Sequence, residues 1–296
     1  MIDIATINDL ARGRFGAFDA PCLLCGPTKR KAASRRKKVL RIWRHEPGFA
    51  TFHCARCGEH GFVRDGSRTR PSDAAAIERA RAEAAERERV TTAERLSKAR
   101  WLWSRRRPIG GTIAEIYLRQ ARGYTGQIPA TIGYLPPRGE HGPAMIAAFG
   151  MTSEFEPGQL VIAGADVQGV HITKLKPDGS GKAGTDADKI MIGMSIGSSI
   201  MLAALNDLLG LVISEGIEDA LSAHEATGLG AWAAGSASRL SALADAVSSY
   251  IETVTLLVDD DKDGRRHAAE LRERLIVRGI KEVRFALADN GIARAA

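Results

Sequence analysis

Residues 253–266 read TVTLLVDDDKDGRR, and this stretch decides the fold of the C-terminal part of the chain. A run of six residues, rich in aliphatic side chains, ends abruptly in Asp259, Asp260 and Asp261. Neighbouring carboxylates repel one another and are costly to remove from water. Either these acids form a solvated turn, or a positive group lies among them. The pattern predicts a buried strand with acids at its carboxyl end.

The sequence around this stretch repeats the same alternation. Similar apolar runs occupy 209–214, 229–234 and 281–287. Helices are predicted between them at 218–228, 236–250 and 264–279, with Ser236 as a candidate cap. Strands that alternate with helices are typical of a parallel sheet covered by helices. The runs lack apolar–polar alternation, which predicts strands buried on both faces.

A second acidic group follows another predicted strand. Glu215 comes directly after the run 209–214, Gly216 is expected to let the chain turn, and Asp219 lies one helical turn further. Ligand sites of open parallel sheets lie beyond the carboxyl ends of the strands. Hard divalent ions such as Mg²⁺ bind carboxylate oxygens and relieve their repulsion. The predicted metal ligands are therefore Glu215, Asp219, Asp259 and Asp261, and solvated turn acids are the alternative.

The motifs VISEGIED at 212–219 and LLVDDDKDGRR at 256–266 resemble the Toprim domain of bacterial-type primases, type IA and II topoisomerases and small nucleases. That family has Glu-Gly after one strand and Asp-x-Asp, followed by glycine, after another. The resemblance covers roughly residues 207–288. It implies Mg²⁺ or Mn²⁺ at the acids and a general acid/base role for Glu215. Many primases carry a further acidic motif after the last strand, whereas only Asp289 is nearby here.

All four cysteines lie near the N-terminus, in two C-x-x-C pairs with 28 residues between the pairs. Such pairs suit Zn²⁺ bound tetrahedrally by four thiolates, and a redox dithiol, the alternative, needs only one pair. Gly26 and Gly58 follow the pairs, where a tight turn needs an unhindered residue. The predicted structural zinc ligands are Cys22, Cys25, Cys54 and Cys57.

The segment between the cysteine pairs is strongly basic. It holds nine Lys or Arg residues within 29–44 and no acid there, and two strands predicted at 39–46 and 48–54 bring aromatic residues among them. Basic groups beside aromatic rings suit single-stranded nucleic acid. The alternative is that the rings form a small core and the charges solvate a loop. The predicted nucleic-acid-binding residues are Arg35, Arg36, Lys37, Lys38, Arg41 and Trp43.

The expected architecture is an α/β fold in four parts. They are an N-terminal four-cysteine zinc ribbon at 1–64, a helical linker at 65–107, a mixed α+β middle domain at 108–206 and a Toprim domain at 207–296. The linker has a polar break at 65–71 and a solvated helix from Ser72 to about Ser104. The middle domain has a short helix within 111–124 that ends near Gly123, and two strands around a turn at 159–175. The loop KPDGSGKAGTDADK at 176–189 fails the P-loop pattern twice.

A zinc ribbon ahead of a Toprim domain resembles the primases of bacteria and, more closely, those of phages and plasmids. This resemblance implies a DNA replication enzyme that makes short RNA primers on single-stranded DNA from NTPs, with the replicative helicase on a separate chain. It also implies that basic residues of the middle domain hold phosphates, namely Lys174, Lys182 and Lys189.

Composition is compatible with this interpretation. The chain is 44% hydrophobic and 26% charged, carries a net charge of +7, and has no apolar run long enough to span a membrane. We see no secretory signal, so a cytoplasmic protein is expected. Three alternatives remain open: a Toprim nuclease, a recombination mediator that binds DNA without catalysis, and a non-catalytic regulator with a residual Toprim fold.

Overall fold

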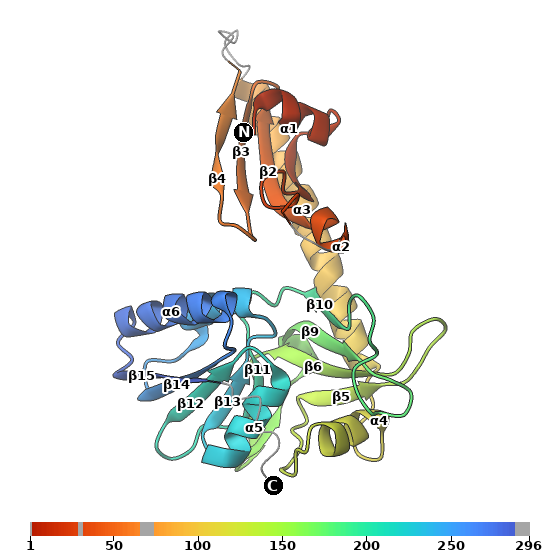
Figure 1. Ribbon diagram of the computed structural model, residues 1–296, viewed down its shortest axis with the longest axis vertical. Helices are drawn as coiled ribbons and strands as arrows, with labels where there is room; N and C mark the ends of the chain where they lie inside the picture. The colour runs from red at the N-terminus through yellow and green to blue at the C-terminus, as the bar shows by residue number, and fades with distance from the viewer. Residues whose placement is uncertain (1, 29–31, 66–73, 288–296) are drawn as a thin grey trace. The chain divides into compact units, whose positions relative to one another are not determined.

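The computed structural model describes residues 2–28, 32–65 and 74–287 (Figure 1). The chain divides into two compact units, Met1–Thr91 and Thr92–Ala296. Most of the predicted polar break, the predicted helix start at Ser72 and the lone acid Asp289 lie outside the described residues. No described helix is both long and apolar enough to cross a membrane.

The N-terminal unit is built on an antiparallel sheet in the order β1-β2-β3-β4. Its elements are α1 (Ile4–Ala11), β1 (Gly16–Pro21), α2 (Ala32–Arg36), β2 (Lys38–Glu46), β3 (Phe49–Cys54) and β4 (His60–Arg64). Its core gathers apolar side chains from α1 and one face of the sheet, including Ile7, Leu40, Ile42 and Phe52. The two predicted ribbon strands are confirmed as the antiparallel pair β2–β3.

Helix α3 (Ala74–Ser104) is the predicted connecting helix, and it crosses the boundary between the units. Most of its described side chains up to residue 98 are exposed, as expected for a solvated helix. Its last turns differ from the prediction because Ala99 and Trp103 are buried with Ile146 and Val170 of the C-terminal unit. The end of α3 is therefore part of a core rather than of a linker.

The first part of the C-terminal unit contains an antiparallel sheet in the order β10-β9-β6-β5. Its elements are α4 (Ile113–Ile116), a π-helical turn (Tyr117–Ala121), β5 (Ile132–Leu135), β6 (Ala144–Gly150), β7 (Ser153–Glu156), β8 (Gln159–Val161), β9 (Val167–Lys174) and β10 (Lys189–Gly193). Both strands predicted within 159–175 exist, but they do not pair with each other. Strand β8 pairs with β7, whereas β9 lies between β6 and β10.

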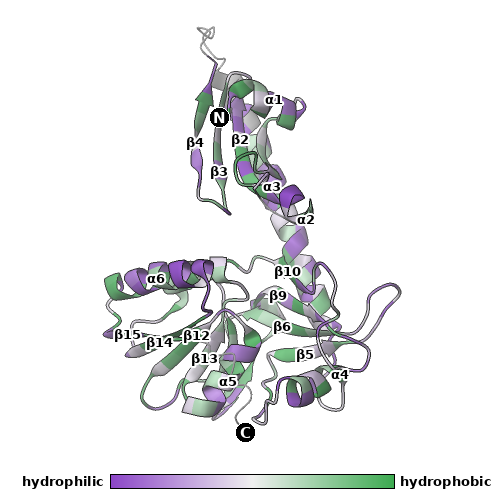
Figure 2. Cartoon of the chain, in the orientation of Figure 1, coloured by the Kyte–Doolittle hydropathy of each residue, from purple (hydrophilic) through white to green (hydrophobic). Residues whose placement is uncertain are grey.

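The second part contains a five-stranded sheet in the order β11-β13-β12-β14-β15. The predicted parallel sheet is confirmed for β12 to β15, and β11 joins it as an antiparallel edge. The elements are β11 (Ile200–Ala203), β12 (Gly210–Ser214), α5 (Ile217–Thr227), β13 (Gly230–Ala233), β14 (Thr253–Val258), α6 (Lys262–Val277) and β15 (Glu282–Leu287). Strands β12 and β13 are largely hydrophobic, whereas α6 carries many hydrophilic residues (Figure 2).

Two predictions about this sheet were wrong. The segment predicted as a helix over 236–250 is a 3₁₀ helix at Ala237–Ala246, and the Ser236 side chain does not cap it. Its buried Leu240 and Leu243 lie three residues apart, a spacing that matches three residues per turn. Strand β14 alternates between buried and half-buried residues and β15 is largely exposed, so of the four predicted strands β12 and β13 are buried on both faces.

A single hydrophobic core joins the two sheets of the C-terminal unit. It includes Tyr117 and Phe149 from the first part and Val212 and Leu221 from the second. The boundary expected between residues 206 and 207 therefore does not separate two compact bodies, and it leaves β11 of the second sheet on the side of the first sheet. The division into four domains remains a prediction from sequence.

Candidate active site

Adjacent parallel strands bring the predicted acids to one edge of the sheet. Strands β12 and β14 are hydrogen-bonded neighbours, with Ser214 opposite Leu257, so Glu215 and Asp259 follow the same edge. Burial raises the pKa of Glu215, and the charge of Asp259 raises it further, while Lys189 opposes the shift. Burial also raises the pKa of Asp219, to which the charges of Glu218 and Asp259 add. The acids thus lie close enough to repel one another.

Main-chain groups fix Glu215 in place. Its carbonyl oxygen accepts a hydrogen bond from the N–H of Gly235 at 2.9 Å, and the N–H of Ala237 donates to its carboxylate. The buried hydroxyl of Ser214 donates to the carbonyl of Gly216 at 2.7 Å. These contacts hold the loop between β12 and α5 against the start of the 3₁₀ helix.

Gly216 is required for space rather than for conformational freedom. Its φ of −93° and ψ of 152° are open to any residue, so the expected role in turning the chain was wrong. A Cβ added there would overlap with Oδ2 of Asp219. The absence of a side chain at 216 therefore lets the Asp219 carboxylate approach the main chain beside Glu215.

The aspartate triplet has three different environments. Asp261 is the N-cap of α6, and its Oδ1 accepts a hydrogen bond from the N–H of Gly264 at 2.7 Å. Helix α6 therefore starts at Lys262, two residues before the predicted start. Asp260 is exposed and ion-paired with Arg265, and Asp259 is half-buried. Asp261 keeps one oxygen that the cap does not use.

The acidic residues suit a hard divalent cation for two reasons. Their carboxylate oxygens are ligands for such an ion, and its charge would relieve the repulsion between them. Mg²⁺ binds carboxylate oxygens and commonly keeps several waters. Across the described residues, only the four cysteines bring three or more ligand atoms within 4.8 Å of one another. No three ligand atoms of the described acids lie within that distance of one another, so the carboxylates are more widely spaced than the thiols. Their assignment as metal ligands remains a prediction.

The three lysines predicted to hold phosphates lie in different places. Lys189 pairs with Thr173 across β9 and β10, and its charge acts on both Glu215 and Asp219. Lys182 lies 3.2 Å from Oε1 of Glu218. Burial alternates along β9, so Lys174 lies on the face opposite Thr173. Only Lys182 and Lys189 are thus brought toward the acids.

The sequence prediction missed Glu218 and its partners. The Glu218 side chain is only 13% exposed. Burial opposes its ionisation, but Lys182 and Tyr117 more than compensate and lower its pKa to about 2. The Tyr117 hydroxyl donates to Glu218 at 2.5 Å and accepts a hydrogen bond from Arg122 at 2.9 Å. The position of Glu218 beside Asp219 was the one signal that the sequence offered.

His171 is a further buried residue that the sequence prediction missed. It lies on the same face of β9 as Thr173, whose hydroxyl is 3.4 Å from its Nδ1. Burial lowers the pKa of His171 to about 4, and Lys189 contributes to the same shift. The imidazole is therefore neutral at pH 7 and adds no charge to the site.

The N-terminal unit brings the four cysteines together. The Sγ atoms of Cys22 and Cys57 are 4.0 Å apart, and those of Cys25 and Cys54 are 3.8 Å apart. Tetrahedral Zn²⁺ with Zn–S bonds of about 2.3 Å places its sulfurs about 3.8 Å from one another. The thiols thus fit a zinc ion.

The two knuckles also have the expected main-chain geometry. The N–H of Cys25 lies 3.4 Å from the Cys22 sulfur. Burial acts to raise the pKa of Cys22, but N–H donors outweigh it and lower the pKa to about 7, whereas burial raises that of Cys25 to about 12. Gly58 has a φ of +73°, and a Cβ at Gly26 would overlap with the Cys22 carbonyl. Both glycines are therefore needed for the knuckles.

The basic and aromatic residues of this unit are divided between core and surface. Phe52 is in the core, and Trp43 is half-buried on the opposite face of the sheet. Arg41 forms an exposed ion pair with Asp19 at 2.9 Å. The other predicted basic residues, Arg35, Arg36, Lys37 and Lys38, are exposed around α2 and the start of β2.

Phe62 is an aromatic residue that the sequence prediction did not select. It is 70% exposed and lies across from Thr51, which itself pairs with Trp43. His53 and His60 form the neighbouring exposed pair on the same strands. The alternation of HGFVR, with polar residues around Phe62, was a signal for this exposed face.

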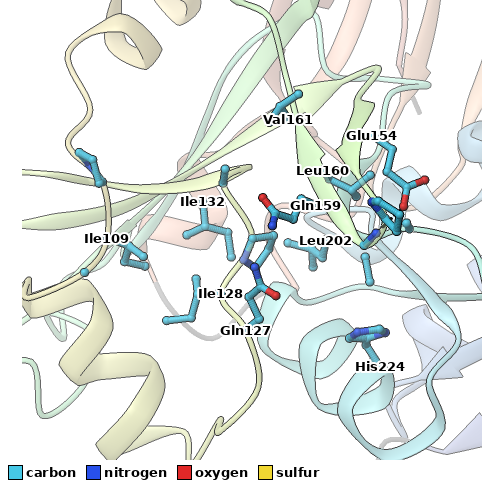
Figure 3. A pocket seen from close by; sticks show the side chains of 18 of the residues that line it. Ile109, Gln127, Ile128, Ile132, Glu154, Gln159, Leu160, Val161, Leu202 and His224 are labelled. Carbon is cyan, nitrogen blue, oxygen red and sulfur yellow. Dashed lines mark hydrogen bonds between the residues drawn. The ribbon is translucent and has the colours of Figure 1, made fainter.

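A cavity of about 780 Å³ lies at the other end of the Toprim sheet (Figure 3). It is lined by residues that precede β12, such as Asp207, and by His224 near the end of α5, whereas the acids follow the carboxyl ends of the strands. Gln127, Gln159 and Leu202 also line it (Figure 3). The cavity is therefore separate from the acidic edge.

Sequence comparison defines the class of the C-terminal unit. Residues 210–291 match the Toprim domain family, and residues 93–202 match a domain family of unknown function, DUF7146. The C-terminal part of the chain thus carries a Toprim domain, and the predicted combination of a four-cysteine cluster with a Toprim domain is confirmed. The boundary between the two matches falls near the predicted one at 206/207. A comparison with curated protein sequences gave no match.

Similar solved structures include two primases. The primase fragment of the bacteriophage T7 primase-helicase protein is 16% identical, with 91% of this chain and 89% of that chain covered and a TM-score of 0.34. The zinc-binding and RNA polymerase domains of the Aquifex aeolicus primase are 13% identical, with 99% and 79% covered and a TM-score of 0.42. Both scores lie below 0.5, so neither likeness establishes the fold of the whole chain.

Proposed function

We propose that this protein is a primase-like nucleotidyltransferase that makes short RNA primers on single-stranded DNA. The observation that carries the proposal is the convergence of Glu215, Asp219 and Asp259 at the carboxyl edge of the Toprim sheet, with Lys189 acting on the same acids. Carboxylates supply a divalent-metal site, and a lysine beside them attracts phosphate. Nucleotidyl transfer needs both.

In this proposal, the acids and the lysine have separate roles. Bound Mg²⁺ would activate the primer 3′-hydroxyl and stabilise the leaving pyrophosphate. The ligands would be Glu215, Asp219, Asp259 and the oxygen of Asp261 that its helix cap leaves unused. Glu215 is also the candidate general acid/base, the role that its resemblance to the glutamate of Toprim enzymes gives it. The phosphate-binding roles of Lys174 and Lys182 remain predictions.

We place the single-stranded template on the open sheet face of the N-terminal unit. Phe62 offers a ring for base stacking, and the exposed basic residues around α2 offer phosphate contacts. A methyl group added at Gly16 of β1 would contact Ala84 of α3. Helix α3 therefore covers the sheet near β1, at the edge away from Phe62 on β4. Structural Zn²⁺ on the four cysteines would hold this unit together.

A single incubation tests the proposal. The protein is mixed with single-stranded DNA, labelled NTPs and Mg²⁺ or Mn²⁺, and the products are separated by size. Labelled oligomers support primer synthesis. A shortened template would instead identify a Toprim nuclease, and a bound but unchanged template without oligomers would identify a DNA-binding protein without catalysis.

Two matched variants make this test specific to the acidic edge. Asp259→Asn should abolish incorporation, because it removes a charged ligand at the strand end. Asp260→Asn removes the same charge one residue further on, but the Asp260 carboxylate pairs with Arg265, so primer synthesis should persist. Equal loss in both variants would contradict the proposed site. A separate helicase chain remains a prediction.

A further inference from the structure

Residues 176–189 resemble a phosphate-binding loop in composition, but they form a tight hairpin. Leu175 and Lys182 make a β-bridge, and the N–H of Lys176 donates to the carbonyl of Gly181 at 3.0 Å. Gly179 is buried with a φ of +73°, and a Cβ there would meet Ile116 of α4 at 2.8 Å. The hairpin turn therefore packs on α4, and Lys182 is directed back toward α5.

Three elements meet at the Glu218 carboxylate. Lys182 comes from the hairpin, Tyr117 from the π-helical turn, and Glu218 from the first turn of α5. The N–H of Arg122 donates to the carbonyl of Tyr117 at 3.1 Å, a five-residue step. This step brings the Arg122 guanidinium to the Tyr117 hydroxyl, at 2.9 Å. π-Helical turns of this kind occur frequently at functional sites.

We propose that Glu218 is a positioning residue, held by Lys182 and Tyr117, that fixes the first turn of α5 and thereby the Asp219 carboxylate. The inference rests on the proposed metal site. Asp219 directly follows Glu218, so a displacement of this turn moves both side chains. Because Asp219 already lies against Gly216, its carboxylate has little room to compensate. Outer residues that orient ligands commonly affect metal affinity as strongly as 10- to 100-fold.

This assignment gives Lys182 a different role from the phosphate contact predicted by sequence. Its ammonium already has a carboxylate partner, and its side chain is 26% exposed. Lys189 is exposed and, within the described part of the chain, has no carboxylate within 4.0 Å. Lys189 is thus better placed for a phosphate, and Lys182 acts through Glu218.

The test uses the full-length protein and two measurements. One is the Mg²⁺ concentration that gives half of the maximal thermal stabilisation, and the other is the KM for NTPs in primer synthesis. Glu218→Gln and Lys182→Met should each raise the half-saturating Mg²⁺ concentration about 10-fold. The double variant should be no worse than either single one, because both changes break one contact.

Two controls separate positioning from general destabilisation. Lys182→Arg keeps the charge and should stay within about twofold of wild type. Lys176→Met removes the same charge from an exposed position of the same hairpin and should leave the Mg²⁺ response unchanged. Melting temperatures without Mg²⁺ report any loss of fold. Variants that melt earlier but keep the wild-type half-saturating Mg²⁺ concentration would overturn the inference.

The remaining outcomes distinguish Lys182 from a phosphate ligand and the inference from the proposed function. If Lys182→Met raises only the KM for NTPs and Glu218→Gln behaves as wild type, Lys182 binds phosphate and the inference is wrong. A further outcome is that wild type makes no primers and yet is stabilised by Mg²⁺, with a weaker stabilisation in Glu218→Gln. In that case the proposed primer synthesis is wrong and the positioning role of Glu218 stands. If Mg²⁺ has no effect on wild type, the inference fails.

Discussion

Gly216→Ala is the most direct perturbation of the proposed metal site, because the new methyl would overlap with one carboxylate oxygen. The main chain at 216 has a negative φ, so alanine causes no backbone strain. The loss of glycine at the N-cap of α5 should cost only about 0.5–1 kcal/mol of stability. The Asp219 carboxylate, however, must move by about 1 Å to restore an ordinary van der Waals contact.

A displacement of this size has a large expected effect on catalysis. Misplacement of a reacting group by 1 Å can cost about 100-fold in rate, so we expect a fall in kcat of that order with template binding unchanged. The assay is primer synthesis on a single-stranded template, with thermal melting as the stability control. Gly142→Ala is the matched variant, since its added Cβ meets nothing within 4 Å. Wild-type rates in Gly216→Ala would refute the spatial role of Gly216.

Three further predictions concern zinc, charge and DNA. Cys54→Ser should release about one Zn²⁺ per chain in elemental analysis and unfold the N-terminal unit, because the metal supplies much of its stability. Because the pKa of Glu215 is raised, the folded protein binds a proton at Glu215 more tightly than the unfolded chain does. The free energy of unfolding of the wild type therefore falls as the pH rises from 4.5, the ordinary pKa of glutamate, through the raised pKa of the folded state. Glu215→Gln escapes this loss, and urea titrations at pH 4.5 and pH 8 should show its advantage only at the higher pH. Phe62→Ala should weaken single-stranded DNA binding by about 1–3 kcal/mol without loss of stability, whereas Phe52→Ala should cost about 3–5 kcal/mol of stability.

Much of the acidic edge could be predicted because its determinants are local in sequence. A strand end followed by Glu or Asp, with glycine close by, places carboxylates at one edge once the sheet is parallel. The zinc cluster was predictable for the same reason, since each knuckle is four residues long. The 3₁₀ geometry at 237–246 was not, because Leu240 and Leu243 fit an α-helical and a 3₁₀ spacing alike.

The Glu218 network could not be predicted because its members are far apart in the chain. Tyr117 and Glu218 are separated by 101 residues, and nothing in the local pattern of either residue indicates the other. Their contact forms only when the first sheet of the C-terminal unit packs on the Toprim sheet. In the N-terminal unit, Phe52 is buried in the core with Ile7 and Leu40, whereas Phe62 is exposed, a distinction that composition alone does not make.

This dependence implies that the Toprim part is not stable by itself. A fragment of residues 207–296 would expose core residues such as Val212 and Leu221 to water and would separate Glu218 from Tyr117 and Lys182. Burial of a Val or Leu side chain contributes about 1.5–3 kcal/mol, so the exposure of several such residues removes a large share of the stability of a domain. We expect this fragment to lack a cooperative thermal transition by circular dichroism, whereas residues 92–296 should melt cooperatively. A cooperative transition in 207–296, with a Mg²⁺ response equal to that of 92–296, would show that the acidic edge forms without the preceding domain.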